Sequence, residues 1–198
     1  MVALFAPEKD IKNEPEILVR LFDSGLLYFH LRKPEMSKEE LIKYLDKIPT
    51  PFHNRIMIHQ HHQLCNQFDL LGIHLKEQTR LDLKDELQEY INGFRKDGKL
   101  LSSSFHDPEE LKSCKINFDY LFLSPLFNSI SKKGYHGKEY NVSTIDNKVI
   151  GLGGVTDQNI DTAKKLGYKG VGVLGYVWYS KNPITAFSKI LKRVKELW

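Results

Sequence analysis

The sequence predicts a single (β/α)8 TIM barrel, compact in size, that spans residues 1–198. Two observations predict this fold. Eight short apolar segments follow one another along the chain, and stretches with helical patterning separate most of them. Because a helix between two strands returns the chain to the same end of a sheet, the strands are expected to run parallel, and eight such units close most simply into a barrel. An open doubly wound sheet is the alternative fold.

Eight segments have the length and apolar composition of buried strands. They are residues 2–6, 26–32, 55–59, 70–75, 99–106, 119–127, 148–155 and 170–178. The segments expected to be helical are residues 13–25, 37–48, 62–68, 82–98, 107–114, 156–167 and 182–198, the third of them a brief helix at best. Ser37 and Glu40 form the capping-box pattern at one helix start, and Asp107 followed by Pro108 is typical of another.

One unit of the barrel is incomplete in the sequence. The stretch 134–147, between the sixth and seventh strands, is too short for a loop followed by a full helix. We therefore expect a shortened or degenerate sixth helix. At about 25 residues per unit, the barrel is near the lower size limit of this fold.

The composition argues against a nucleic-acid-binding protein and against a membrane protein. Lys and Arg exceed Asp and Glu by 29 − 25 = 4, without the basic cluster that follows a phosphate backbone, so we expect no nucleic-acid partner. The two cysteines have no metal or redox spacing, no apolar run has the length of a membrane helix, and no basic segment precedes the first apolar one. These features indicate a cytoplasmic protein without a membrane partner. A homodimer is possible through the "VWY" segment, residues 177–179, if it is exposed.

Polar residues follow the predicted strands, at the end where such barrels place their active sites. The resulting candidates are His30, Arg32, Lys33, His59, Gln60, His74, Lys76, Ser104, His106, Ser124, Gly153, Gly154, Leu174 and Gly175. If Leu31 faces the helices, strand alternation turns His30 and Arg32 into the barrel mouth. An inward arginine needs an anion, because burying an unpaired guanidinium is costly.

A phosphate is the expected anion. The pair Gly153 and Gly154 and the later Gly175 lie on the last two strand-to-helix turns, where backbone N–H groups can approach a ligand closely. Glycines also make tight turns without any ligand. The segment "NSISKK" offers Ser129, Ser131 and Lys132, which could close over an anion or form an ordinary surface loop.

These motifs resemble the thiamine phosphate synthase and TenI superfamily along most of the chain. The resemblance is carried by "HLRK" at 30–33, "GIHL" at 72–75, "SFH" at 104–106, "DYLFLSPLF" at 119–127, "SISKK" at 129–133 and "GLGGV" at 151–155. It implies a (β/α)8 barrel that binds a phosphorylated thiazole. The synthase joins hydroxymethylpyrimidine diphosphate to thiazole phosphate and releases diphosphate with the help of Mg²⁺. TenI proteins aromatise a carboxythiazole phosphate by a proton shift without a metal.

The chain departs from the synthase pattern at its metal ligands. Where that pattern has Asn-Asp after the third strand and Asp after the fourth, this sequence has His59, Gln60 and Thr79. The resemblance is therefore closer to the TenI branch, with His106 implied as the proton-transfer residue and His30 and Arg32 holding the substrate. That reading implies no cofactor and no metal.

Three alternatives stay open. A true synthase would need Mg²⁺ held by a rearranged set that includes Glu77. A metallohydrolase would use His59 and His61 as metal ligands. A barrel without catalytic activity would bind its ligand for regulation only.

Overall fold

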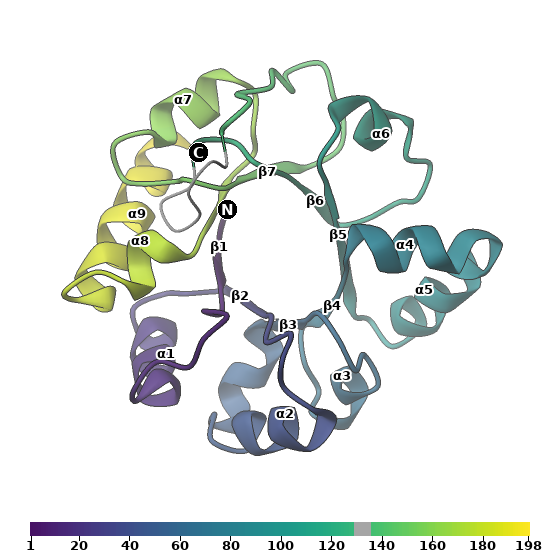
Figure 1. The fold of residues 1–198 in the computed structure, drawn as a ribbon, viewed down its shortest axis with the longest axis vertical. Coiled ribbons are helices and arrows are strands. Elements are labelled where there is room, and N and C mark those ends of the chain that lie inside the picture. The colour runs from purple at the N-terminus through teal and green to yellow at the C-terminus, as the bar shows by residue number, and fades with distance from the viewer. Residues whose placement is uncertain (129–135) are drawn as a thin grey trace.

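The computed structural model describes residues 1–128 and 136–198, and its eight strands form a closed parallel barrel. Each strand pairs with the next along the chain, and β1 pairs with β8, which excludes the open sheet. The strands are β1 (Val2–Phe5), β2 (Tyr28–Leu31), β3 (Ile56–Ile58), β4 (Gly72–Leu75), β5 (Leu100–Phe105), β6 (Tyr120–Leu123), β7 (Val149–Leu152) and β8 (Val171–Val173). Figure 1 shows this ring of strands with the helices around it.

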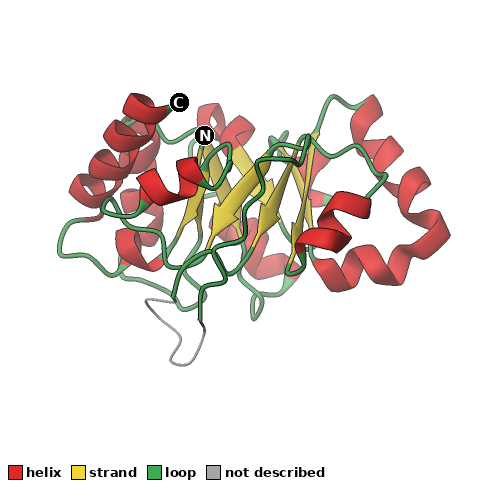
Figure 2. Ribbon diagram, turned by 90° about the horizontal axis from the view of Figure 1, so that it is seen from above, coloured by secondary structure: helices red, strands yellow, loops and turns green. Residues whose placement is uncertain are grey.

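The helices cover the outside of the barrel, which Figure 2 shows from a second direction. They are α1 (Glu14–Asp23), α2 (Lys38–Leu45), α3 (Leu64–Gln67), α4 (Glu77–Leu83), α5 (Leu87–Lys96), α6 (Pro108–Ser113), α7 (Ile160–Lys165), α8 (Gly175–Trp178) and α9 (Pro183–Leu197), with 3₁₀ turns η1 (Thr50–Arg55) and η2 (Lys84–Glu86). The described residues between β6 and β7 contain no helix, which confirms the degenerate sixth unit.

Local capping chemistry explains two of the helix starts. The Ser37 side chain accepts from the backbone N–H of Glu40, and the Glu40 carboxylate accepts from the N–H of Ser37, so the capping box is complete. Asp107 accepts from the N–H groups of Glu109 and Glu110 at the start of α6. These bonds satisfy N–H groups that have no partner within the helix.

The eighth unit differs from the prediction. The strand ends at Val173, and residues 175–178 form α8 instead of continuing the strand. Trp178 is buried, and its Nε1–H donates to the Phe5 carbonyl oxygen at 2.7 Å. Val177 is fully buried as well. The expectation of an exposed "VWY" surface is therefore wrong for two of its three residues; Tyr179 alone is exposed, at 57%.

Strand alternation divides the apolar side chains into two layers. A large cluster between the strands and the helices includes Phe29 and Leu31, and a smaller cluster inside the barrel includes Phe5, Tyr120 and Phe122. Leu31 therefore faces the helices, as the argument for an inward His30 and Arg32 requires. None of the helices in the described part of the chain has the length and apolar character needed to span a bilayer.

Candidate active site

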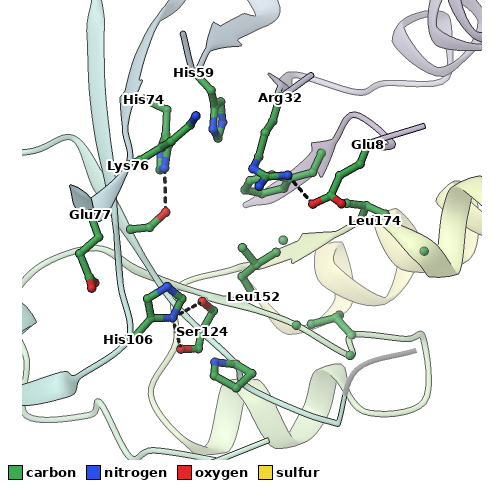
Figure 3. Close-up of a pocket in the computed structure, with 18 of the residues that line it drawn as sticks. Glu8, Arg32, His59, His74, Lys76, Glu77, His106, Ser124, Leu152 and Leu174 are labelled. Carbon is green, nitrogen blue, oxygen red and sulfur yellow. Dashed lines mark hydrogen bonds and ion pairs between the residues drawn. The ribbon is translucent and has the colours of Figure 1, made fainter. Parts of the chain in front are cut away.

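A cavity of about 560 Å³ opens at the carboxyl ends of the strands. Eleven of the predicted site residues line it: Arg32, His59, His74, Lys76, Ser104, His106, Ser124, Gly153, Gly154, Leu174 and Gly175. Figure 3 shows His59, His74 and Arg32 on one side of this space and His106 with Ser124 on the other. Closure of the barrel brings these distant segments together, because each follows a different strand.

Three predicted residues lie outside the lining of the cavity. Lys33 is 1% exposed, and its Nζ lies 2.6 Å from Glu14 Oε2 on α1, in the helical layer. Alternation explains this placement, because Lys33 is one residue past the inward Arg32 and so faces the other side. Gln60 donates from Nε2 to the Lys33 and Met36 carbonyls at 2.8 and 3.1 Å. His30 is fully buried inside the barrel. The predicted residues Ser129, Ser131 and Lys132 lie outside the described residues.

The floor of the cavity is built from neutral histidines. His59 and His74 stack with ring centroids 4.1 Å apart, and His30 Nδ1 lies 2.9 Å from His59 Nε2. Burial lowers the pKa of His30 to about 3. Burial, followed by the repulsion that a second protonated histidine would add, lowers the pKa of His59 and His74 well below the usual range. All three are therefore uncharged at neutral pH.

These three histidines form a group with the composition of a metal site. One nitrogen from each lies within 4.8 Å of the others. A metal ion binds in the plane of an imidazole, however, and the His59 and His74 planes are stacked and only 27° apart. One ion cannot lie in both planes at bonding distance unless a ring turns. The group includes neither His61 nor a carboxylate, so it does not match the metallohydrolase alternative.

Charged residues surround one part of the cavity. Arg32 forms an ion pair with Glu8, and Lys76 and Glu77 line the space nearby (Figure 3). Burial, followed by the charge of Arg32, lowers the pKa of the Lys76 amine. Glu77 Oε2 is buried and has no hydrogen-bond partner among the described residues. This part of the cavity can hold an anionic group beside two cations.

His106 is placed for acid–base chemistry. It follows β5 and lies at the exposed edge of the cavity, where its Nδ1 is 3.0 Å from the Ser124 carbonyl oxygen. A carbonyl can only accept, so Nδ1 carries the proton of the neutral ring. Nε2 is then the basic nitrogen, available to take a proton from a bound molecule.

The fold itself requires glycine in the turn after β7. Gly153 and Gly154 have φ of 105° and 66°, and a Cβ on Gly154 would lie 2.2 Å from the Asn128 carbonyl oxygen. Close contact with the segment after β6 therefore requires glycine even without a ligand. The same packing brings the backbone of this turn to the cavity that His59 and His74 also line.

Two residues that contact members of the predicted site, Tyr120 and Glu8, are not among the residues predicted from the sequence. Tyr120 lies two positions before the inward Phe122 on β6, and alternation predicts it inside the barrel. Glu8 lies beyond the end of β1, where the rule of strand ends does not select it. Its ion pair with Arg32 brings it to the cavity.

A family model, related sequences and solved structures all show similarity to thiamine-phosphate synthases. The family described as thiamine monophosphate synthase matches residues 2–177. Thiamine-phosphate synthases of Chlamydia abortus and Chlamydia caviae are 25% and 26% identical, over 88% and 86% of this chain and 82% of each relative. The structure of a thiamine phosphate pyrophosphorylase from Bacteroides thetaiotaomicron is 30% identical, with a TM-score of 0.76 over 98% of this chain and 97% of that one. The chain therefore belongs to the thiamine monophosphate synthase family, whose enzymes act in thiamine biosynthesis.

Proposed function

We propose that the cavity binds a phosphorylated thiazole. Its phosphate would lie against the backbone of Gly153, Gly154 and Gly175, and its ring would lie between the histidine floor and His106. The observation that carries this proposal is the lining of the cavity itself. A glycine turn, a base and a neutral floor face one space in a chain of this family.

For the reaction, the named relatives favour thiamine-phosphate synthase, so we take this as the first candidate. The sequence motifs alone place this reaction second, after the tautomerase. Mg²⁺, which the synthase reaction uses, would be held here by Glu77, because its buried Oε2 lacks a partner among the described residues. When bound, the ion would offset the charge of the departing diphosphate. Arg32 and Lys76 would add positive charge to the same region.

A specific observation favours a second candidate, the thiazole tautomerase. The three positions of the synthase metal ligands hold no carboxylate: His59 is part of the neutral floor, Gln60 is tied to backbone carbonyls, and Thr79 does not line the cavity. His106 would move the proton through Nε2, which needs no metal. Arg32 would orient the substrate carboxylate.

One pair of assays separates the two reactions. The first mixes the protein with Mg²⁺, hydroxymethylpyrimidine diphosphate and thiazole phosphate and measures thiamine phosphate; the second follows aromatisation of the carboxythiazole phosphate in the presence of a chelator. If the protein is a synthase, Glu77→Gln lowers thiamine phosphate formation tenfold or more. If it is a tautomerase, His106→Ala lowers aromatisation by about 100-fold, the scale of one general acid–base group.

His61→Asn is the matched control, because it removes a histidine outside the cavity at a positive φ that asparagine tolerates. It should leave both rates unchanged. If neither activity is found, calorimetry with thiazole phosphate tests the binding proposal alone. Failure of the unmodified protein to bind it would refute the proposed substrate class.

A further inference from the structure

Lys76 brings a positive charge into the cavity without a counter-ion among the described residues. It directly follows β4, and Figure 3 shows its amine directed toward His59 and Arg32. The amine forms neither a hydrogen bond nor an ion pair with any described residue. It lies close enough to the Arg32 guanidinium for the two charges to repel each other. Two cations therefore share one wall of the cavity.

The carboxylates in the described lining of the cavity leave donors of these two cations unused. The Arg32 guanidinium donates to Glu8 through Nη1, and its Nη2 and Nε groups have no partner among the described residues. Glu77 follows Lys76 in the sequence, but no ion pair joins them, and Figure 3 shows their side chains leaving the chain in different directions. The remaining N–H groups of Arg32 and Lys76 are available to an anion.

The charge of this wall departs from the synthase pattern. Gln60 and Thr79 stand at positions where that pattern has aspartates, so these two carboxylates are absent. Lys76 instead places a second cation beside Arg32. Carboxylate oxygens are the protein ligands that suit Mg²⁺, and two neighbouring cations repel a divalent ion. The wall at Arg32 and Lys76 is therefore suited to an anion and not to a metal ion.

The number of donors indicates the class of anion. The Lys76 ammonium and the unused N–H groups of Arg32 together outnumber the lone pairs that one carboxylate offers. A diphosphate group has more acceptor oxygens, spread over two centres of negative charge. Lysine binds phosphate groups as a point charge, and arginine binds them through its planar pair of donors. The donors of this wall therefore match a diphosphate better than a carboxylate.

We propose that Arg32 and Lys76 bind a diphosphate group directly, with the Lys76 ammonium in the role that a metal ion has in the synthase pattern. The choice of diphosphate rests on the first candidate function, whose pyrimidine substrate carries this group. Any Mg²⁺ at Glu77 would then serve the chemical step and would not be needed for binding. Lys76 is a specificity-determining residue for the anionic end of that substrate.

Calorimetry with inorganic diphosphate in the presence of a chelator tests this role. The unmodified protein should bind diphosphate under these conditions. Lys76→Met should weaken binding by about tenfold to 100-fold, the scale of one charge-assisted hydrogen bond, and Lys76→Arg should retain most of the affinity because it keeps the charge. Lys43→Met is the matched control, because it removes the same charge from an exposed position on α2 outside the cavity. It should leave the affinity unchanged.

Three results of this titration would overturn the proposal. The first is binding of diphosphate by the unmodified protein only after Mg²⁺ is added, because the metal would then be the required cation. The second is equal affinity in Lys76→Met and Lys43→Met. The third is competition by acetate at the same concentration as diphosphate, because a single carboxylate would then suffice for the wall.

A second measurement uses the unmodified protein and so does not depend on the folding of a variant. Mild acetylation followed by mass spectrometry reports the reactivity of each lysine. Saturating diphosphate with a chelator should protect Lys76 from acetylation and leave Lys43 reactive. Equal reactivity of Lys76 with and without diphosphate would contradict direct binding by its amine.

These measurements are independent of the thiazole phosphate titration that tests the proposed substrate class. If the unmodified protein binds thiazole phosphate but not diphosphate, the role of Lys76 is refuted and the proposed thiazole site stands. If it binds diphosphate with the expected dependence on Lys76 but not thiazole phosphate, the proposed substrate class fails and the diphosphate site stands.

Discussion

Lys33 illustrates how one position along a strand decides the role of a residue. It directly follows Arg32, but its ammonium group is buried between α1 and α2, beside Glu14 and close to Asp10. Glu14 is itself buried and also accepts from the Tyr44 hydroxyl at 2.8 Å. A buried pair of this kind holds two segments together, and breaking it leaves one charge without a partner.

Replacement of Lys33 by methionine should lower the free energy of unfolding by about 3–5 kcal/mol, because the Glu14 carboxylate would remain buried and uncompensated. Urea unfolding at pH 7 measures this loss. Lys43→Met, at an exposed position on α2, is the control and should change stability by less than about 0.5 kcal/mol. Adding Glu14→Gln to Lys33→Met should restore part of the loss; a further loss would argue against the charge as its cause.

At the scale of elements, the turn after β7 connects packing with ligand access. Its backbone lines the cavity because the segment after β6 lies directly against it, with the Leu126 and Phe127 N–H groups donating to the Leu152 and Gly153 carbonyls at 2.8 and 2.9 Å. A side chain at Gly154 would separate these two segments. The glycines therefore serve the fold first, and the proposed phosphate site uses the surface that they leave open.

Gly154→Ala should destabilise the protein more than Gly98→Ala. Both glycines have a positive φ, of 66° and 72°, so both variants carry a similar backbone cost of about 1 kcal/mol. A Cβ at Gly98 meets nothing within 4 Å, whereas at Gly154 it meets backbone atoms, which adds about 1–3 kcal/mol. Equal losses for the two variants in urea unfolding would show that the contact after β6 can relax.

At the scale of the whole molecule, four buried histidines couple stability to pH, three around the barrel interior and one, His62, against α5. His30, His59, His62 and His74 all have a lowered pKa, to about 3 for His30 and about 4 for His62, with burial as the main cause. In the unfolded chain these rings take up protons below about pH 6.5. The free energy of unfolding therefore has its full value above that pH. It decreases as the pH falls toward the pKa values of these histidines in the folded protein.

We expect the free energy of unfolding to decrease between pH 6.5 and pH 5, with up to about 1.4 kcal/mol per pH unit for each of the four histidines. Urea unfolding at several pH values gives the slope. His62→Gln removes one titrating group, so its slope should be smaller whatever its stability at pH 7. A flat profile across this range in the unmodified protein would contradict the lowered pKa values.

The sequence by itself determined the eight-unit barrel, its incomplete sixth helix and the strand ends that line the cavity. These follow from local periodicity, capping residues and the fixed position of strand ends in a parallel barrel. The family resemblance came from the same motifs, while the named relatives support the synthase more than the tautomerase that the motifs suggested.

Only the tertiary structure decided which polar residues at those ends meet the cavity. Lys33 forms a buried ion pair with Glu14 on α1, and Gln60 hydrogen-bonds to backbone carbonyls. Glu8 lies at the cavity because it pairs with Arg32. The hydrogen bonds of His30 to His59 and Tyr120, and of His74 to Ser102 and Ser104, likewise connect strands that no local pattern connects. The physical reason is that a polar side chain is placed by the partner that satisfies it, and closure of the barrel supplies partners from distant parts of the chain.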